Sequence, residues 1–445
     1  MVKIHFGTDG IRGRANENLT VRMAYRIGQY LGNHFGKEHK ARILIGRDTR
    51  LSGTMFETAL ASGITGVGGD AFLLKVCSTP SLVYLVREGK FDCGIMISAS
   101  HNPFRDNGIK VVTGAGTKMN ADVEADIEEY MYGDEELPLA TGDRIGEVFD
   151  YQDGLEIYYS YLCGLFPEDL SQFRILLDCA NGSATVTAEK VFRRLGADVT
   201  VMANTPDGMN INRGCGSTHP EDLVEAVKND IYDAGFAYDG DADRLISVAP
   251  DGQIIDGDKV LYMCGKYLKK HGKLRNGKLV TTVMANLGLF KKLDAEGIGY
   301  EKTAVGDKYV YDCMCKNDYV LGGEQSGHII FKDLATTGDG LLTSLFLLKV
   351  MREEGKTLNE LTDDLFIYPQ LLINVEVKDK HAAIEDPEVK AICAKVEEEL
   401  EGEGRVLVRP SGTEPLIRVM VEARSDELCA YHVGRVVDVI KARDL

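Results

Sequence analysis

The sequence predicts three consecutive α/β domains with mixed, mostly parallel sheets, followed by a C-terminal α+β domain. Three observations support this fold class. Short β-branched runs alternate with helix-length amphipathic stretches along most of the chain, and residues 368–445 depart from that rhythm. The length of 445 residues also exceeds what one hydrophobic core usually organises.

The alternating rhythm predicts right-handed βαβ units, in which a strand, a loop and a helix recur in that order. An apolar run predicts each strand, and a longer stretch with apolar residues at helical spacing predicts the helix that follows it. Three such strand–helix pairs are clear in the sequence: 41–46 with 47–64, 174–185 with 186–196, and 277–286 with 287–297.

The C-terminal segment predicts a small unit that contains a β-hairpin. We expect a strand within 366–377, an acidic helix within 385–402 and a hairpin within 405–423, before a final helix. Turn-rich segments separate the predicted domains, which we place at 1–150, 151–250, 251–367 and 368–445.

The charge balance limits the partners of the protein. Lysine and arginine number 51 against 69 acidic residues, which leaves a net charge of −18. This excess disfavours nucleic acid or an anionic membrane as a partner, and a phosphorylated substrate would need a local cluster of cations. The N-terminus lacks the apolar core of a signal peptide, and the apolar stretch at 341–351 is too short to span a bilayer. We therefore expect a cytoplasmic protein.

Ten cysteines are scattered through apolar runs. Without a signal peptide, reduced and mostly buried thiols are expected rather than disulfides. The close pair Cys313 and Cys315 lacks a second pair at the spacing of a zinc site, so we predict no metal there.

The segment YDGDADR predicts a metal site. In an extended segment, Asp239, Asp241 and Asp243 would project to one side. Two such charges about 5 Å apart repel by roughly 3 kcal/mol at an effective dielectric of about 20, so a cation is expected between them. A calcium EF-hand requires glycine and glutamate where Arg244 and Pro250 stand, and oxygen ligands alone suit Mg²⁺. The alternative is a solvated acidic turn.

The segment GIMISASHNP places polar residues at the end of an apolar strand. It lacks the G-x-S-x-G elbow, and the neighbours Ser100 and His101 would point to opposite faces of an extended chain. We therefore interpret Ser100 as a carrier of a phosphoryl group, which would supply the anionic oxygen that the three aspartates lack. Lys110 follows as a proton donor, a proton acceptor or a cation for phosphate. The alternative is a polar turn before Asn-Pro.

Two further segments suggest contacts to a phosphorylated sugar. In RPSGTEPLIR, guanidinium groups, hydroxyls and a glycine amide suit a phosphate dianion, unless the segment is only a decorated hairpin turn. GGEQSGH (322–328) offers the donors and acceptors that a polyhydroxylated ligand needs, unless it is a flexible loop. Arg12 lies in a glycine-flanked loop where backbone can approach a ligand. The segment 335–340 predicts a capped helix start instead.

These clusters follow strands of predicted parallel sheets, where ligand sites gather. Ser98 to Asn102, Asp239 to Arg244 and Glu324 to His328 each follow a different strand. The sequence therefore predicts one site assembled between domains.

Taken together, the motifs resemble those of the α-D-phosphohexomutase superfamily. FGTDGIRG, SASHNPFRDNGIK, DGDADR, GGEQSGH and RPSGTEP match in order and spacing, from residue 4 to about residue 424. Within the superfamily, NINRGCGSTHPE (210–221), the glutamine of GEQSGH and TTGDGLL resemble the branch that acts on glucosamine phosphates. Arg105 and Lys308 depart from the usual pattern of that branch, which frequently has an aromatic residue and arginine there.

The resemblance implies a four-domain enzyme with the active site in a central cleft and a C-terminal domain like the TATA-binding protein. It implies interconversion of glucosamine 6-phosphate and glucosamine 1-phosphate through a phosphoserine and a 1,6-bisphosphate, feeding UDP-N-acetylglucosamine synthesis. The implied cofactor is one Mg²⁺ per subunit, with glucosamine 1,6-bisphosphate or a similar compound as primer. A homodimer is compatible with it.

The resemblance also assigns roles to individual residues. Ser100 is the implied phosphoserine, and its phosphate joins Asp239, Asp241 and Asp243 around Mg²⁺. The residues implied to serve the transferring phosphate and proton movement are Arg12, His101, Lys110, Arg244 and His328. Those implied to hold sugar hydroxyls or the distal phosphate are Glu324, Ser326, Arg409, Ser411, Gly412 and Thr413, to which Arg418 is added from the residue chemistry.

Three alternatives remain at this point. The first is the same chemistry on glucose or mannose phosphate, as in phosphoglucomutases and phosphomannomutases. The second is a sugar-phosphate phosphatase with a phosphoserine intermediate. The third is a non-catalytic protein that binds phosphosugars.

Overall fold

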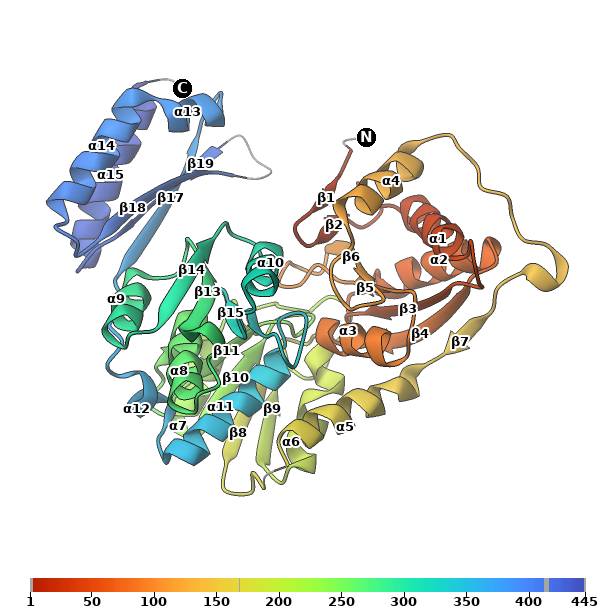
Figure 1. Ribbon diagram of the computed structural model, residues 1–445, viewed down its shortest axis with the longest axis horizontal. Helices are drawn as coiled ribbons and strands as arrows, with labels where there is room; N and C mark the ends of the chain where they lie inside the picture. Colours follow the sequence, from red (N-terminus) through yellow and green to blue (C-terminus); the bar gives the residue numbers. More distant parts are fainter. Residues whose placement is uncertain (1–2, 168, 412–415, 444–445) are drawn as a thin grey trace. The chain divides into compact units, whose positions relative to one another are not determined.

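The computed structural model describes residues 3–167, 169–411 and 416–443. The chain divides into two compact units, the larger from 1–284 and 298–362 and the smaller from 285–297 and 363–445. Three sheets belong to the larger unit and one to the smaller. Figure 1 labels most of their strands. The predicted fold class is confirmed: α/β sheets come first along the chain, and an antiparallel sheet with helices follows.

The first sheet has seven strands in the order β1-β2-β6-β5-β3-β4-β7. Its central strands β3, β4 and β5 run parallel, whereas β6 pairs with antiparallel neighbours on both sides. Apolar side chains of these strands, including Ile43, Ile45 and Ile95, are buried in one core. The strands are β1 (Phe6–Gly7), β2 (Gly10–Arg14), β3 (Arg42–Arg47), β4 (Asp70–Val76), β5 (Cys93–Ile97), β6 (Asp106–Thr113) and β7 (Val148–Asp150).

Four helices accompany the first sheet, and the first and third of them start with a side-chain cap. The hydroxyl of Thr20 accepts a hydrogen bond from the Met23 amide, and Ser78 accepts one from the Ser81 amide. A Cβ at Gly28 would lie 2.4 Å from the carbonyl oxygen of Leu60, so glycine permits the close packing of the first two helices. The helices are α1 (Val21–Phe35), α2 (Gly53–Gly66), α3 (Thr79–Glu88) and α4 (Ala121–Tyr132), and the 3₁₀ turns η1 (Gly142–Arg144) and η2 (Gln152–Gly154) follow.

The second sheet has five strands in the order β12-β11-β10-β8-β9. β8 pairs in parallel with β9 and β10, and β11 and β12 add an antiparallel edge. The strands are β8 (Arg174–Asp178), β9 (Asp198–Met202), β10 (Ala234–Tyr238), β11 (Leu245–Val248) and β12 (Ile254–Ile255). The helical segments are α5 (Leu155–Leu165), η3 (Ser183–Val186), α6 (Ala188–Arg194) and α7 (Glu221–Asn229).

The third sheet has four strands in the order β14-β13-β15-β16. The long helix α11 starts where predicted, because the carboxylate of Asp339 accepts a hydrogen bond from the Leu342 amide. The strands are β13 (Lys278–Thr282), β14 (Gly299–Thr303), β15 (Leu321–Gly323) and β16 (Ile329–Phe331). The helical segments are α8 (Gly257–Lys270), η4 (Arg275–Gly277), α10 (Asp307–Asn317), α11 (Gly340–Glu354) and α12 (Leu358–Thr362).

The smaller unit contains an antiparallel sheet in the order β17-β19-β18. Helix α9, which lies between β13 and β14 in sequence, belongs to this unit: the Asn286 side chain donates to the Tyr368 carbonyl at 3.0 Å, and Glu422 accepts from the Leu287 amide at 2.9 Å. The strands are β17 (Gln370–Glu376), β18 (Arg405–Pro410) and β19 (Leu416–Glu422). The helices are α9 (Leu287–Ala295), α13 (Lys380–Glu385), α14 (Pro387–Glu399) and α15 (Asp426–Ala442).

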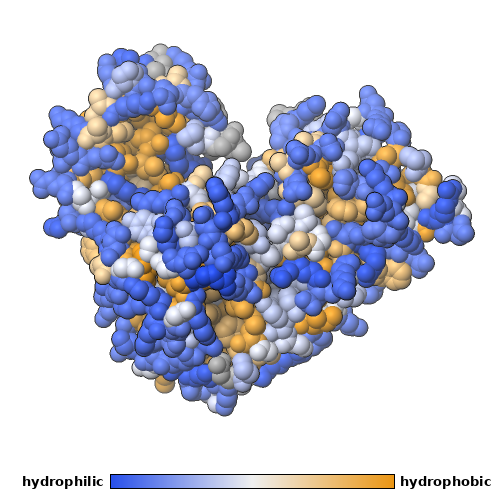
Figure 2. Space-filling model, viewed as in Figure 1, coloured by the Kyte–Doolittle hydropathy of each residue, from blue (hydrophilic) through white to orange (hydrophobic). Residues whose placement is uncertain are grey.

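The surface visible in Figure 2 is mainly hydrophilic, with hydrophobic residues in separate patches. Across the described ranges, every helix is too short or too polar to cross a bilayer. All ten cysteines are free thiols.

Candidate active site

The nucleophile candidate Ser100 lies in the loop after β5 and is 1% exposed. Its backbone is left-handed, with φ of +51°, which a non-glycine residue adopts only at a cost. Because the chain is not extended here, the prediction that Ser100 and His101 point to opposite faces is wrong. The Oγ of Ser100 lies 3.4 Å from Nδ1 of His101.

Arg50 holds this loop in place. Its guanidinium, 1% exposed, donates to four carbonyl oxygens, those of Ser100 (2.9 Å), Asn102 (2.8 Å), Pro103 (2.5 Å) and Asp106 (2.9 Å). One buried cation therefore satisfies four of the carbonyls between residue 100 and residue 106.

The partner of Arg50 is Asp48, a fully buried carboxylate. Its Oδ2 accepts from Nε of Arg50 at 2.8 Å and from the hydroxyl of Ser98 at 2.7 Å. The hydroxyl of Ser98 in turn accepts from the Ser100 amide at 2.9 Å. Ser100 is thus positioned by a continuous chain of hydrogen bonds from the end of β3.

A second anchor comes from the loop after β9. The side-chain amide of Asn212, itself buried, donates to the carbonyl oxygens of Ser100 at 2.9 Å and Asn102 at 3.1 Å. The segment that precedes α7 therefore fixes the loop that follows β5.

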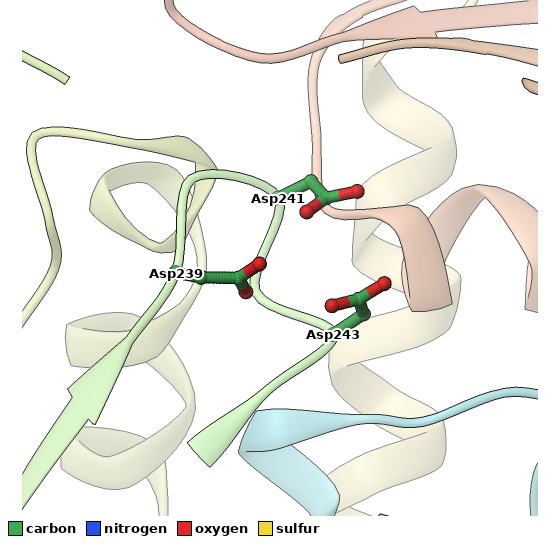
Figure 3. Close-up of side chains that lie close together, drawn as sticks. All are labelled: Asp239, Asp241 and Asp243. Carbon is green, nitrogen blue, oxygen red and sulfur yellow. The ribbon is translucent and has the colours of Figure 1, made fainter. Parts of the chain in front are cut away.

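The three aspartates predicted to bind metal meet in the loop after β10. One oxygen from each of Asp239, Asp241 and Asp243 lies within 4.8 Å of the others, and all three residues are buried (Figure 3). The predicted convergence is present, but the predicted extended backbone is not, because Ala242 has a φ of +57° and the carboxylates gather by a turn. The hydroxyl of Ser100 donates to Oδ2 of Asp239 at 2.5 Å.

The charge distribution in this cluster suits a divalent cation. Burial raises the pKa of Asp239 well above its usual value, and the neighbouring carboxylates of Asp243 and Asp241 raise it further. One oxygen each of Asp241 and Asp243 is buried without a hydrogen-bond partner. Carboxylate oxygens that are buried, mutually repulsive and partly unpartnered are the donor set that a hard divalent metal ion binds.

Lys110 lies among these carboxylates. Its Nζ is 2.7 Å from Asp241, 2.9 Å from Asp9 and 3.6 Å from Asp243. Burial opposes the charged form, yet Asp241 and Asp9 outweigh it and raise the pKa of Lys110 well above its usual value. Of the roles that the sequence leaves open for Lys110, the geometry favours a cation over a proton acceptor.

Two arginines lie beside the cluster. Arg12 forms an ion pair with Asp9, and Nε of Arg244 lies 3.9 Å from Oδ1 of Asp243. Burial lowers the pKa of His101 to about 4, with the positive charges of Arg244 and Arg12 acting in the same direction, so this imidazole is neutral near pH 7.

The segment GGEQSGH contributes three predicted residues. Glu324 accepts a hydrogen bond from the Gly306 amide at 3.0 Å, while Ser326 is exposed. His328 is buried, with Nδ1 3.6 Å from Asp243, and its Nε2 accepts from the Gly338 amide at 2.9 Å. Because Nε2 accepts from this amide, the proton of the ring lies on Nδ1 and faces Asp243.

The predicted phosphate-binding residues belong to the smaller unit. Arg409 and Arg418 are direct partners across β18 and β19, so their charges adjoin. Burial lowers the pKa of Arg409, and Arg418 lowers it further. The Ser411 carbonyl accepts from Nζ of Lys380 at 2.7 Å. The predicted Gly412 and Thr413 lie outside the described residues.

Sequence reasoning did not identify Lys118 and Asp307 as site residues. Nζ of Lys118 lies 3.4 Å from Asp9 and 2.5 Å from Asp307, so it joins the loop before β2 to the start of α10. Although burial opposes ionisation of Asp9, Lys110 and Lys118 hold its pKa well below the usual value. Asp9 lies inside the quoted motif FGTDGIRG, which was its only signal.

Four known domain families match the chain in order. They are the phosphoglucomutase/phosphomannomutase α/β/α domains I (3–137), II (156–252) and III (256–367) and the C-terminal domain (372–439). The chain therefore belongs to the phosphoglucomutase/phosphomannomutase family, and the superfamily resemblance read from the motifs is confirmed.

Curated relatives indicate which branch of the family this chain resembles. The chain is 53% identical to the phosphoglucosamine mutase of Lachnoclostridium phytofermentans over 99% of this chain and 98% of the relative. It is 49% identical to the phosphoglucosamine mutase of Bacillus licheniformis, with 98% of each chain covered. A solved phosphoglucomutase/phosphomannomutase family protein of Burkholderia thailandensis shares the fold, with a TM-score of 0.81, 23% identity and 98% of both chains covered.

Proposed function

We propose that this protein is a phosphoglucosamine mutase that interconverts glucosamine 6-phosphate and glucosamine 1-phosphate. The observation that carries the proposal is the 2.5 Å contact between the Ser100 hydroxyl and Asp239, a member of a buried carboxylate triad. The full-length similarity to phosphoglucosamine mutases supports the choice of an amino sugar.

In the first step, phosphorylated Ser100 gives its phosphoryl group to O1 of glucosamine 6-phosphate. The bond between the seryl oxygen and phosphorus breaks, a bond between phosphorus and O1 forms, and the proton of the sugar hydroxyl passes to the seryl oxygen. The resulting 1,6-bisphosphate turns end for end, and transfer of its 6-phosphate to Ser100 by the same exchange releases glucosamine 1-phosphate. Glucosamine 1,6-bisphosphate or a similar compound would prime unphosphorylated Ser100.

The residues around Ser100 would mainly position and neutralise charge. Asp239, Asp241, Asp243 and the seryl phosphate would hold one Mg²⁺, which would neutralise charge on the transferred group. The unpartnered oxygens of the triad fit this assignment. The hydrogen bonds that Arg50 and Asn212 donate to the Ser100 carbonyl would hold this loop in place during transfer.

Other residues would hold the substrate. Arg12 and Arg244 would bind oxygens of the transferring phosphate, and Lys110 would keep the carboxylates ionised. Glu324 and Ser326 would contact sugar hydroxyls, and His328 would orient the triad through Asp243. The distal phosphate would be held by Arg409, Ser411, Gly412, Thr413 and Arg418.

The decisive experiment combines one variant with a comparison of substrates. We expect Ser100→Ala to lower kcat more than a hundredfold while Ser62→Ala, an exposed serine of α2, leaves it unchanged. Residual activity above about a hundredth of wild type would assign the transfer to another group. The ratio of kcat/KM for glucosamine, glucose and mannose phosphates then separates the amino-sugar enzyme from the other mutases.

The same assay tests the phosphatase alternative. A mutase conserves the phosphoryl group, so inorganic phosphate should stay far below the amount of substrate converted. Release of one phosphate per substrate consumed would instead identify a phosphatase.

A further inference from the structure

A cavity of about 680 Å³ lies between two loops outside the metal-binding cluster. One wall is formed by residues 101–106, which follow the nucleophile, and the other by residues from 209 to 219, which precede α7. The aspartates of the triad do not line it, and neither does Arg12 or Arg244. The cavity is therefore a space distinct from the aspartate cluster, and it adjoins the loop that carries Ser100.

The lining of this cavity is rich in basic side chains. In a chain with a net charge of −18, three arginines and two histidines line this one cavity, although His101 is neutral near pH 7 because its pKa is lowered to about 4. One carboxylate, that of Asp106, also lines it, and its Oδ2 accepts from the side-chain amide of Asn102 at 3.0 Å. The basic residues are Arg14, His101, Arg105, Arg213 and His219.

Two of these arginines lack a carboxylate partner. Among the residues that the structure describes, Arg105 and Arg213 form no ion pair, and both are exposed to solvent. Arg14, in contrast, lies 3.5 Å from Glu17, and His219 lies 4.0 Å from Glu221. The guanidinium groups of Arg105 and Arg213 are thus available to an external anion.

The remaining wall is apolar. Phe104, Met209 and Ile211 line the same cavity, and the guanidinium of Arg105 lies 5.9 Å from the centre of the Phe104 ring. A ligand that suits both parts carries an anionic group and a ring or apolar body. The planar fork of arginine matches phosphate oxygens in pairs, which favours phosphate as the anion.

We propose that this cavity binds an organic phosphate, separately from the site of phosphoryl transfer. His101 connects the two places, since it lines the cavity and lies 3.4 Å from the Ser100 hydroxyl. Asn212 does so as well, because it lines the cavity and donates to the Ser100 carbonyl. An occupant would therefore bridge the loops that hold the nucleophile and change the rate of turnover.

The test is calorimetric titration of the full-length enzyme with phenyl phosphate, which has a phosphate dianion and a ring. Mg²⁺ is present throughout, and glucosamine 6-phosphate is left out because it is itself an organic phosphate and would compete for the cavity. A separate mutase assay, which rests on the proposed function, shows whether each variant keeps its transfer site. The cavity variant is Arg105→Ala/Arg213→Ala. The matched control Arg22→Ala/Lys37→Ala removes the same charge from two exposed positions, one in α1 and one just after it.

We expect phenyl phosphate to bind the wild type, the cavity variant to bind it at least tenfold more weakly, and the control to match the wild type within about twofold. Equal affinity in the wild type and the cavity variant would overturn the proposal. It would also be overturned by an equal loss in both variants, which would reflect net charge alone, or by the absence of binding to the wild type. Thermal unfolding confirms that each variant is folded.

Discussion

The guanidinium of Arg50, which is buried in the loop after β3, donates to the carbonyl oxygen of Ser100 at 2.9 Å. The same group binds three more carbonyls of that loop. A left-handed serine backbone costs about 1–3 kcal/mol and persists only where the surroundings impose it. Arg50, together with Ser98 and Asn212, holds this conformation, so the geometry of the proposed nucleophile depends on residues outside the aspartate cluster.

Arg50→Lys should therefore impair catalysis more than its conserved charge suggests. A lysine can remain paired with Asp48 but cannot reach four carbonyls, because it lacks the guanidinium fork. We expect kcat to fall at least tenfold with KM nearly unchanged, since the loop rather than substrate binding is disturbed. Arg50→Met should also lower the unfolding free energy by about 3–5 kcal/mol, because it leaves Asp48 buried and unpaired. Steady-state kinetics and thermal unfolding check both statements, and unchanged kcat in Arg50→Lys would contradict them.

Asn212 gives a second and milder test of loop positioning. Asn212→Ala removes two donors to loop carbonyls and should lower kcat about three- to tenfold, with about 1 kcal/mol lost in stability. Asn212→Asp should be worse than alanine, because a carboxylate would face the carbonyl oxygens of Ser100 and Asn102. The measurement is kcat of both variants, and we expect the alanine variant to be the more active of the two. A more active aspartate variant would refute the role assigned to the amide.

Lys118 tests the connection between Asp9 and Asp307. Lys118→Met leaves both carboxylates without this cation, and we expect kcat/KM to fall about tenfold. Lys118→Arg should retain most of the activity, since it restores a charge at the same place. Lys37→Met, at an exposed lysine, is the matched control and should behave as wild type. If arginine rescues stability but not activity, the link serves the fold only.

Asp178 predicts a pH dependence of stability. Burial raises the pKa of this carboxyl to about 6, although the amides of Gly216 and Ala180 donate to it. Because the folded pKa exceeds the unfolded value of about 3.9, the contribution to stability is greatest below pH 4 and is lost as the pH rises through 6. Asp178→Asn removes this titratable group, so the effect of the asparagine on the unfolding free energy does not depend on pH.

The measurement is the unfolding free energy of wild type and Asp178→Asn at pH 5 and pH 7. Over this interval we expect the wild type to lose about 1 kcal/mol more than the variant. Both proteins are measured at the same concentration of Mg²⁺. A difference between them that does not change with pH would show that Asp178 titrates normally.

The sequence was sufficient for the chemistry that is written in consecutive residues. The Ser100 and Asp239–Asp243 segments each follow an apolar strand, and parallel sheets gather such segments at one edge. Their proximity could be expected, and the 2.5 Å contact of Ser100 with Asp239 agrees with it. The domain limits at residues 150, 250 and 367 remain predictions, because the domain families match ranges within the chain and do not fix the boundaries between them.

What the sequence could not supply is the set of supporting residues. Arg50 and Asn212 reach Ser100 across 50 and 112 positions, and no local pattern distinguishes an arginine that binds carbonyls from one on the surface. Backbone conformation was equally hidden: Ala242 and Ser100 adopt positive φ, which propensity assigns to glycine or asparagine. Extended geometry was assumed at both places, and both assumptions failed for that reason.

The left-handed conformation of Ser100 restricts which residue can replace it. Glycine would adopt this conformation without strain but would lack the hydroxyl. Threonine would keep the hydroxyl, but its β-branched side chain would be more strained in the same backbone conformation. The loop is thus less stable than the same loop with glycine would be. The side chain of Ser100 therefore comes with a cost to folding that glycine at the same position would not carry.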